Sequence, residues 1–238
     1  MFPYADGVSM GTMKTRGSMG LRLAVLGGVA VVAVLVAVML AGGGSSSTSG
    51  GGSDKAVTSA LNGIPQSGIS LGSPNAPVTI VEFADLQCPF CAEYHHAVFP
   101  TILKRYVRTG KVRLELRLLR FIGPDSDRLG RVAVAAAGQN RMWQFVSLAY
   151  ARQGRENSGY ANKAFINKLA ADAGLSKVDA GQAAGRQLTQ NESIAKTLGI
   201  NSTPSFLIGK TGGPFERFQP SDLTPSAFTP AIDSALGQ

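Results

Sequence analysis

The sequence predicts one α/β domain that is preceded by a single transmembrane helix. Three observations support this prediction. A long apolar run lies near the start, a β-branched strand pattern leads directly into a Cys-x-x-Cys motif, and an alanine-rich helical block separates this part from two further strand patterns. Strands that alternate with helical patterns are typical of α/β folds. We therefore expect the order β-α-β, helical block, β-β-α.

Residues 23–41 contain no charged or polar side chain. About 20 such residues form a helix that spans a bilayer, so we expect a transmembrane anchor at 21–41. Basic residues stay on the cytoplasmic side of a membrane. Three of them come before the apolar run, namely Lys14, Arg16 and Arg22. We therefore expect a cytoplasmic tail at 1–20 and the rest of this single-pass protein outside the cytoplasm. A cleaved signal peptide is the alternative, and it sends the domain to the same side.

The segment that follows, 42–53, contains only glycine, serine and threonine, which predicts a flexible linker. Residues 54–77 are rich in turn-forming residues and predict a lead-in arm to the main domain, 78–238. The net charge is +8. In the basic segment 111–120, charged and apolar residues alternate and no aromatic residue lies between the charges. This pattern predicts a strand with one solvated face and does not favour nucleic-acid binding.

The elements of the domain can be predicted in order. Residues 78–84 predict a strand that is buried on both faces. After the cysteine motif, apolar residues at four-residue spacing predict a helix that Pro100 kinks and Gly110 ends. A strand at 111–119 and a helical insert at about 127–193 follow. The last elements are two strands and a helix, at 204–209, 215–218 and 223–236.

Cys88 and Cys91 lie at the carboxyl end of the first predicted strand and at the start of the following helix. Sites of open α/β sheets form at this end of the strands. Unpaired backbone N–H groups and the helix dipole stabilise an anion there. We therefore expect a lowered pKa for Cys88, which makes it a nucleophile and a good leaving group. Pro89 suits the first helical turn, and the deeper Cys91 suits a resolving role.

Three interpretations of the motif differ in chemistry. A structural disulfide would close only a four-residue loop and contribute little stability. A zinc or copper site would use Cys88, Cys91 and His95, which share a helix face; His96 lies about 100° further round the helix. Taken individually, both histidines are expected to be ordinary surface or partly packed residues. A catalytic dithiol alone accounts for the helix start, the preceding strand and the export together.

Two stretches, TIVEFADLQCPFC and Ser202-Thr203-Pro204-Ser205-Phe206, resemble the DsbA-like thiol:disulfide oxidoreductases of the thioredoxin superfamily. The resemblance covers about 72–238 and implies a thioredoxin fold with an inserted helical subdomain. It implies that Cys88 is the substrate-facing nucleophile and that Cys91 is the resolving thiol. It also implies that Pro204 is a cis-proline. The residues that match the substrate contact surface of the family are Pro89, Phe90, Thr203 and Pro204.

Glu82 stands where this family often places a buried carboxylate, which implies a proton relay to Cys91. The alternative is a position at a wet edge or beside an arginine. The strongest oxidants of the family carry histidine where this chain has Phe90, and they tend to carry valine where it has Thr203. These two departures leave the direction of electron flow open.

The resemblance implies an enzyme that introduces disulfides into exported polypeptides bearing free thiols, without a bound cofactor. An external partner must then reoxidise the dithiol, and by resemblance this is a membrane protein of the DsbB or vitamin K epoxide reductase type. One alternative is a reductase or isomerase that is kept reduced. Another is a metallochaperone-like module that binds copper or zinc through Cys88, Cys91 and His95.

Overall fold

The computed structural model describes residues 58–178 and 180–237, all of which belong to one unit of the chain, Ser49–Gln238. The predicted cytoplasmic tail, transmembrane anchor and linker lie outside the described residues. Among the described residues, no helix combines the length and the apolar character that a membrane crossing requires.

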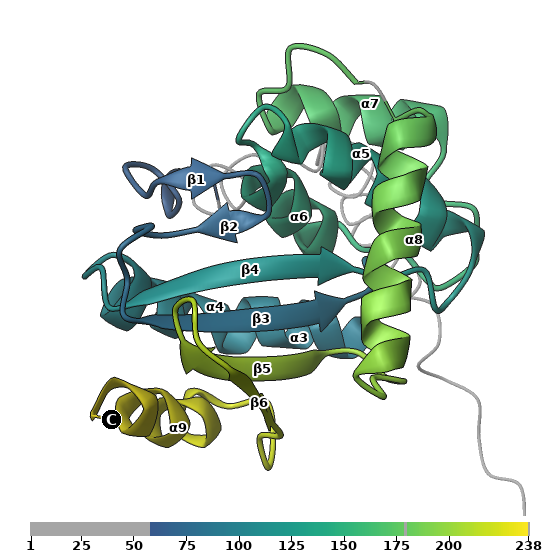
Figure 1. The fold of residues 1–238 in the computed structure, drawn as a ribbon. Helices are drawn as coiled ribbons and strands as arrows, with labels where there is room; N and C mark the ends of the chain where they lie inside the picture. Colours follow the sequence, from purple (N-terminus) through teal and green to yellow (C-terminus); the bar gives the residue numbers. More distant parts are fainter. Residues whose placement is uncertain (1–57, 179, 238) are drawn as a thin grey trace, which may run out of the picture. The chain divides into compact units, whose positions relative to one another are not determined.

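A six-stranded mixed sheet forms the centre of the domain, in the order β1-β2-β4-β3-β5-β6 (Figure 1). The central strand β3 runs parallel to β4 and antiparallel to β5. All of its residues are buried, as the sequence VTIVEFA predicts. The strand bounds are β1 Gln66–Ser67, β2 Ser70–Leu71, β3 Val78–Ala84, β4 Val112–Leu118, β5 Ser205–Lys210 and β6 Phe215–Phe218.

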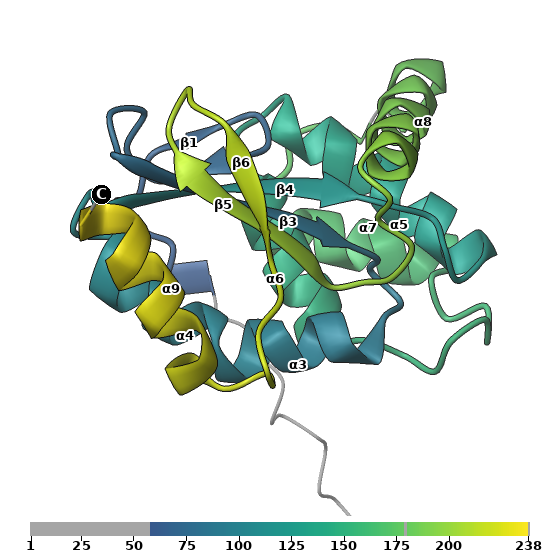
Figure 2. The same ribbon diagram turned by 60° about the horizontal axis from the view of Figure 1, so that its bottom comes forward.

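Helices cover both faces of this sheet. Figure 2 shows α3, α4 and α9 together on one face, and α8 packs against the other. The expected order of elements is thus confirmed, and each predicted strand lies within one residue of its expected bounds. The helices are α3 Pro89–Ala97, α4 Phe99–Ile102, the π-helix η1 Leu103–Val107, α5 Pro124–Ala137, α6 Met142–Ala151, α7 Lys163–Asp172, α8 Gln182–Thr197 and α9 Pro225–Gly237.

The helix expected after the cysteine motif is divided into three pieces. α3 ends before Val98, α4 begins with Phe99 and Pro100, and η1 continues to Val107. Proline lacks an N–H group and so interrupts the hydrogen-bond ladder of a helix, as expected at Pro100. Gly110 then adopts a φ of +74°, which ends this helical stretch as predicted.

The segment expected as a lead-in arm adds two short strands to the sheet. β1 and β2 form a hairpin, and β2 pairs antiparallel with β4, where Ser70 lies opposite Glu115. Leu71 is fully buried. At the next residue, Gly72, φ is +113° and a Cβ atom would lie 2.9 Å from the carbonyl oxygen of Val112. Only glycine therefore allows the arm to pass so close to β4.

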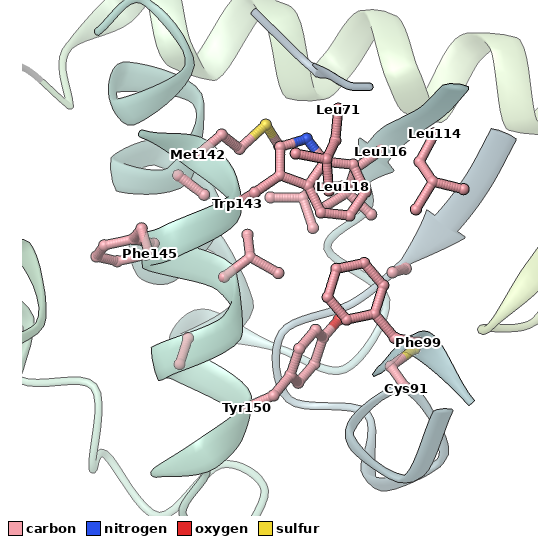
Figure 3. Close-up of a cluster of buried hydrophobic side chains, with 14 of the residues drawn as sticks. Leu71, Cys91, Phe99, Leu114, Leu116, Leu118, Met142, Trp143, Phe145 and Tyr150 are labelled. Atoms are coloured by element: carbon pink, nitrogen blue, oxygen red, sulfur yellow. The ribbon is translucent and has the colours of Figure 1, made fainter. Parts of the chain in front are cut away.

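In the described residues, the insert between β4 and β5 contains the helices α5, α6, α7 and α8. α6 is its buried centre: Trp143 lies beside Leu71 of β2 and Leu116 and Leu118 of β4 (Figure 3). The indole Nε1 of Trp143 donates a hydrogen bond of 3.2 Å to the carbonyl oxygen of Ile69. The insert therefore shares one hydrophobic core with the sheet and the arm.

Candidate active site

Cys88 is the N-cap residue of α3, with extended backbone angles and Pro89 at the first helical position. Its backbone N–H donates to the carbonyl oxygen of Asp85 over 3.0 Å, and its carbonyl oxygen accepts from the N–H of Ala92 over 3.1 Å. The cysteine is thus fixed between the end of β3 and the first turn of α3. This is the location that the sequence predicts.

The pKa of Cys88 is lowered from 9.0 to about 6. The largest cause is a hydrogen bond from the thiol of Cys91, which stabilises the Cys88 thiolate; burial opposes the shift. The side chain of Thr203 and the backbone N–H groups of Phe90 and Cys91 lower the pKa further. The helix amides therefore help to lower the pKa of Cys88, as expected, but the thiol of Cys91 lowers it more.

Cys91 has the opposite properties. Its side chain is fully buried, whereas Cys88 keeps 4% of its surface exposed. Burial raises the pKa of Cys91 well above 9.0, and the thiol of Cys88 and the negative charge of Glu82 raise it further. The two cysteines are not bonded to each other. The site thus holds one thiol that ionises near neutral pH and one that keeps its proton.

The peptide bond between Thr203 and Pro204 is cis, as the resemblance implied. It precedes β5, and the thiol of Cys88 donates a hydrogen bond of 3.2 Å to the carbonyl oxygen of Thr203. The side chains of Pro89 and Phe90 point to solvent, and Phe90 is 60% exposed. Of the predicted substrate contact residues, Thr203 thus contacts the Cys88 sulfur, and Pro89 and Phe90 directly follow Cys88 at the exposed start of α3.

A network of buried polar groups holds the loop before Cys88, and sequence reasoning missed it. The carboxylate of Asp85 accepts hydrogen bonds from three backbone N–H groups and one hydroxyl, namely those of Gln87, Phe121, Ile122 and Ser126. From the insert, Gln153 Nε2 donates to the carbonyl oxygens of Leu86 over 3.0 Å and Cys88 over 3.1 Å. The acidic residue directly after an apolar strand was the signal for this network.

Glu82 and His95 form a buried pair beneath the dithiol. The Nε2 atom of His95 lies 3.3 Å from Oε2 of Glu82, and their side chains are 2% and 4% exposed. Of the two alternatives for Glu82, burial is thus confirmed, and its partner is a histidine. The expectation that His95 is an ordinary surface or partly packed residue was wrong, because its ring packs against Phe99 and Tyr150. His96 is exposed, as expected.

The alternative metal site is not formed. No group of three His, Cys, Asp or Glu side chains in the described part of the chain is arranged to hold a metal ion. His95 shares a helix face with Cys91, but its imidazole is directed to Glu82 on β3. The ligand set of Cys88, Cys91 and His95 therefore does not converge on one centre.

A mixed sheet with a dithiol at a helix start and a cis-proline beside it defines a thioredoxin-like protein with a helical insert. A family model described as "Thioredoxin" matches residues 65–233. The chain belongs to this thioredoxin family.

Known relatives agree with this assignment. A "Probable disulfide bond formation protein D" of Bacillus anthracis is 34% identical over 116 residues, which are 48% of this chain and 52% of the relative. The chain thus matches about half the length of that protein.

Two crystal structures share the fold. Oxidised BdbD from Bacillus subtilis has a TM-score of 0.61 and 19% identity, and the match covers 71% of this chain and 93% of BdbD. Alpha-DsbA1 from Wolbachia pipientis has a TM-score of 0.57 and 22% identity, and the match covers 74% of this chain and 92% of that protein. At these identities the likeness concerns the fold.

Proposed function

We propose that this protein is a thiol-disulfide oxidoreductase that introduces disulfides into exported polypeptides through Cys88 and Cys91. The observation that carries the proposal is the difference between the two thiols. The pKa of Cys88 is about 6, whereas that of Cys91 lies well above 9.0. Cys88 keeps part of its surface exposed and Cys91 is fully buried, so an incoming thiolate reaches Cys88. The low pKa of Cys88 then makes it the better leaving group when the mixed disulfide is resolved.

The exchange needs two steps. In the disulfide form, a substrate thiolate attacks the sulfur of Cys88; the bond between Cys88 and Cys91 breaks, and Cys91 leaves and takes up a proton. The second substrate thiolate then attacks the substrate sulfur of this mixed disulfide and expels Cys88 as a thiolate. Two electrons have passed to the cysteine pair, and the substrate has gained a disulfide. The low pKa of Cys88 favours the second step.

The site geometry fits an extended peptide substrate. Phe90 and Pro89 form an exposed apolar surface at the start of α3. Thr203, held by the cis peptide bond that precedes β5, contacts the Cys88 sulfur through its carbonyl oxygen. A peptide that lies between these two surfaces brings its own cysteine to Cys88. The polar loop network keeps Cys88 in position during the attack.

The reduction potential tests the direction of electron flow. The full-length chain is equilibrated with glutathione buffers of graded composition, and its reduced fraction is measured after acid quenching. We expect a potential closer to about −120 mV, the value of a strong oxidant, than to about −270 mV, the value of thioredoxin. A value at the thioredoxin end would reject the oxidase and favour the alternative reductase or isomerase. The Cys91→Ala variant, which cannot form the intramolecular disulfide, is the control.

We further propose that the domain works outside the cytoplasm in the cell membrane, tethered by an uncleaved helix at 21–41. The apolar run and the basic residues before it support this location. A membrane redox partner of the DsbB or vitamin K epoxide reductase type would then regenerate the disulfide. Alkaline extraction of membranes and protease treatment of intact spheroplasts test the location. Release of the chain by alkali, or protection of its domain from external protease, would contradict it.

A further inference from the structure

The proton of Cys91 has no direct route to solvent. Each time the disulfide opens, Cys91 leaves as a thiolate and must gain a proton; each time it closes, the thiol must lose one. The side chain is fully buried, and burial raises its pKa well above 9.0. The charge of Glu82 raises the same pKa, so the carboxylate of Glu82 is close enough to interact with this thiol. A base beside Cys91 is therefore needed for rapid closure.

Glu82 has a second buried neighbour, the side chain of His95. Nε2 of His95 lies 3.3 Å from Oε2 of Glu82, at ion-pair distance but off the line of a direct hydrogen bond. Among the described residues, neither nitrogen of His95 nor Oε1 of Glu82 has a hydrogen-bond partner. A small rotation of the imidazole would place Nε2 in line with the carboxylate, where a proton can be exchanged between the two groups. Such a pair can pass that proton in either direction.

The imidazole is held in place by aromatic rings. Ring centroids of Tyr150 and Phe99 lie 4.4 Å and 4.9 Å from that of His95, and the ring of Tyr94 lies edge-on at 5.4 Å. The ionisable groups around His95 are Glu82 on β3, Cys91 and Tyr94 on α3, and Tyr150 on α6. Burial raises the pKa of both tyrosines well above 10.0, so they stay protonated. Glu82 is thus the proton acceptor that faces this ring.

His95 also borders an open cavity. This cavity, with a volume of about 70 Å³, lies between the α3–η1 helical stretch and α6, and His95, His96, Phe99 and Ser147 contribute to its lining. One water molecule requires about 10–15 Å³, so the cavity has room for several. The buried hydroxyl oxygen of Ser147, like the nitrogens of His95, has no hydrogen-bond partner in the described part of the chain. Because both nitrogens of His95 are closed off from the cavity in this structure, the imidazole must turn toward the cavity before its proton can reach water there.

We propose that His95 is a positioning residue that carries the proton of Cys91 between Glu82 and the cavity. On closure of the disulfide, the proton of Cys91 passes to Glu82 while the Cys91 sulfur attacks Cys88. The bond between Cys88 and its mixed-disulfide partner breaks, and that partner leaves as a thiolate. The proton then passes from Glu82 to His95 and from His95 to water in the cavity. The opening of the disulfide uses the same route in reverse.

The test separates the step that involves Cys91 from the step that does not. Reduced full-length protein is mixed with oxidised glutathione, and the products are quenched with acid and counted by mass spectrometry. Attack of Cys88 on glutathione disulfide gives the mixed disulfide, and attack of Cys91 then closes the ring and releases glutathione. In His95→Phe, which keeps the ring stacking, we expect closure to slow at least about tenfold, while the first step keeps the wild-type rate. Glu93→Gln, the loss of an exposed ionisable side chain on the same helix, should leave both steps unchanged.

A second measurement distinguishes proton transfer from packing. His95→Ala enlarges the cavity, and added imidazole should restore closure, whereas pyrrole, a ring of similar size that does not shuttle a proton, should not. In the Glu82→Gln background, His95→Phe should cause no further loss, because His95 acts only through Glu82. Closure at the wild-type rate in His95→Phe, equal rescue by pyrrole, or an equal loss in Glu93→Gln would overturn the relay.

This inference rests on the proposed function, and the two fail in different ways. If wild-type protein forms no mixed disulfide with glutathione, the exchange activity is rejected and the relay with it. If wild-type protein completes both steps and the His95 variants close as fast, only the relay is rejected. Should His95→Phe fail to fold, as judged by circular dichroism, the rescue of His95→Ala by imidazole decides the question.

Discussion

The side chain of Gln153 donates a hydrogen bond of 3.1 Å from Nε2 to the carbonyl oxygen of Cys88. Gln153 follows α6, so the insert is attached directly to the backbone of the nucleophile. The same Nε2 atom also donates to the carbonyl oxygen of Leu86. The insert is therefore a part of the active site and not only a cover for it.

We predict that Gln153→Ala destabilises the loop before Cys88. Two carbonyl oxygens lose a donor, so the free energy of unfolding should fall by about 1–3 kcal/mol. Thiol exchange at Cys88 should slow, because the sulfur is held less firmly. Urea unfolding and the rate of reaction with oxidised glutathione measure the two effects. Gln182→Ala, an exposed change on α8, is the control and should alter neither.

We predict that Cys91→Ala raises the pKa of Cys88 above its value of about 6, because the bond from Cys91 is the largest cause of the shift. The pKa should stay below 9.0, since the helix amides and Thr203 remain. Cys91→Ser keeps a hydroxyl donor and should preserve more of the shift. The rate of alkylation by iodoacetamide, measured against pH, gives each pKa. An unchanged value in Cys91→Ala would show that the helix start alone lowers the pKa.

We predict that the reduced protein becomes more stable between about pH 6 and pH 9. The pKa of Cys88 is about 6 in the folded state and near 9.0 in the unfolded chain. In this window the folded state binds fewer protons than the unfolded state, so the free energy of unfolding rises with pH. The contribution is lost as the pH falls through about 6. Above pH 9 the raised pKa of Cys91 acts in the opposite sense.

The stability prediction requires a subtraction, because other groups titrate too. Chemical unfolding of the reduced wild type is compared with that of Cys88→Ser at each pH. The difference between the two proteins should grow from pH 6 to pH 9. A constant difference across this range would contradict the lowered pKa.

We predict that Phe90→His makes the protein more oxidising. Phe90 is largely exposed at the second position of α3, so an imidazole can be accommodated there and can stabilise the Cys88 thiolate. Stabilising the reduced form raises the reduction potential, by about 30 mV for each tenfold change in the equilibrium constant. Glutathione titration measures the change. Phe215→His, on the exposed strand β6, should leave the potential unchanged.

Much of the fold could be predicted because its strands and turns depend on local sequence patterns. The strand VTIVEFA, the alternation along β4 and the turn at Gly110 each depend on neighbouring residues, and each is present. The β1–β2 hairpin was missed because its strands have two residues each. Their pairing depends on β4, more than forty residues further along the chain, and no local pattern reports it.

In the candidate site, too, the features that depend on neighbouring residues could be predicted and those that depend on distant residues could not. Cys88 at a helix start follows from the strand that precedes it. The burial of His95 does not, because Glu82, Phe99 and Tyr150 come from three different elements to enclose it. The dominant role of Cys91 in lowering the pKa of Cys88 likewise depends on the orientation of a side chain. Spacing alone cannot report that orientation.

Both edge strands of the sheet are short: β1 has two residues and β6 has four. A long unpaired strand margin serves as a template for another extended polypeptide. A protein proposed to handle unfolded clients meets many such polypeptides. Short edge strands limit the pairing of a substrate polypeptide with the sheet. Contact is then confined to the surroundings of the Cys88 sulfur and ends when exchange is complete.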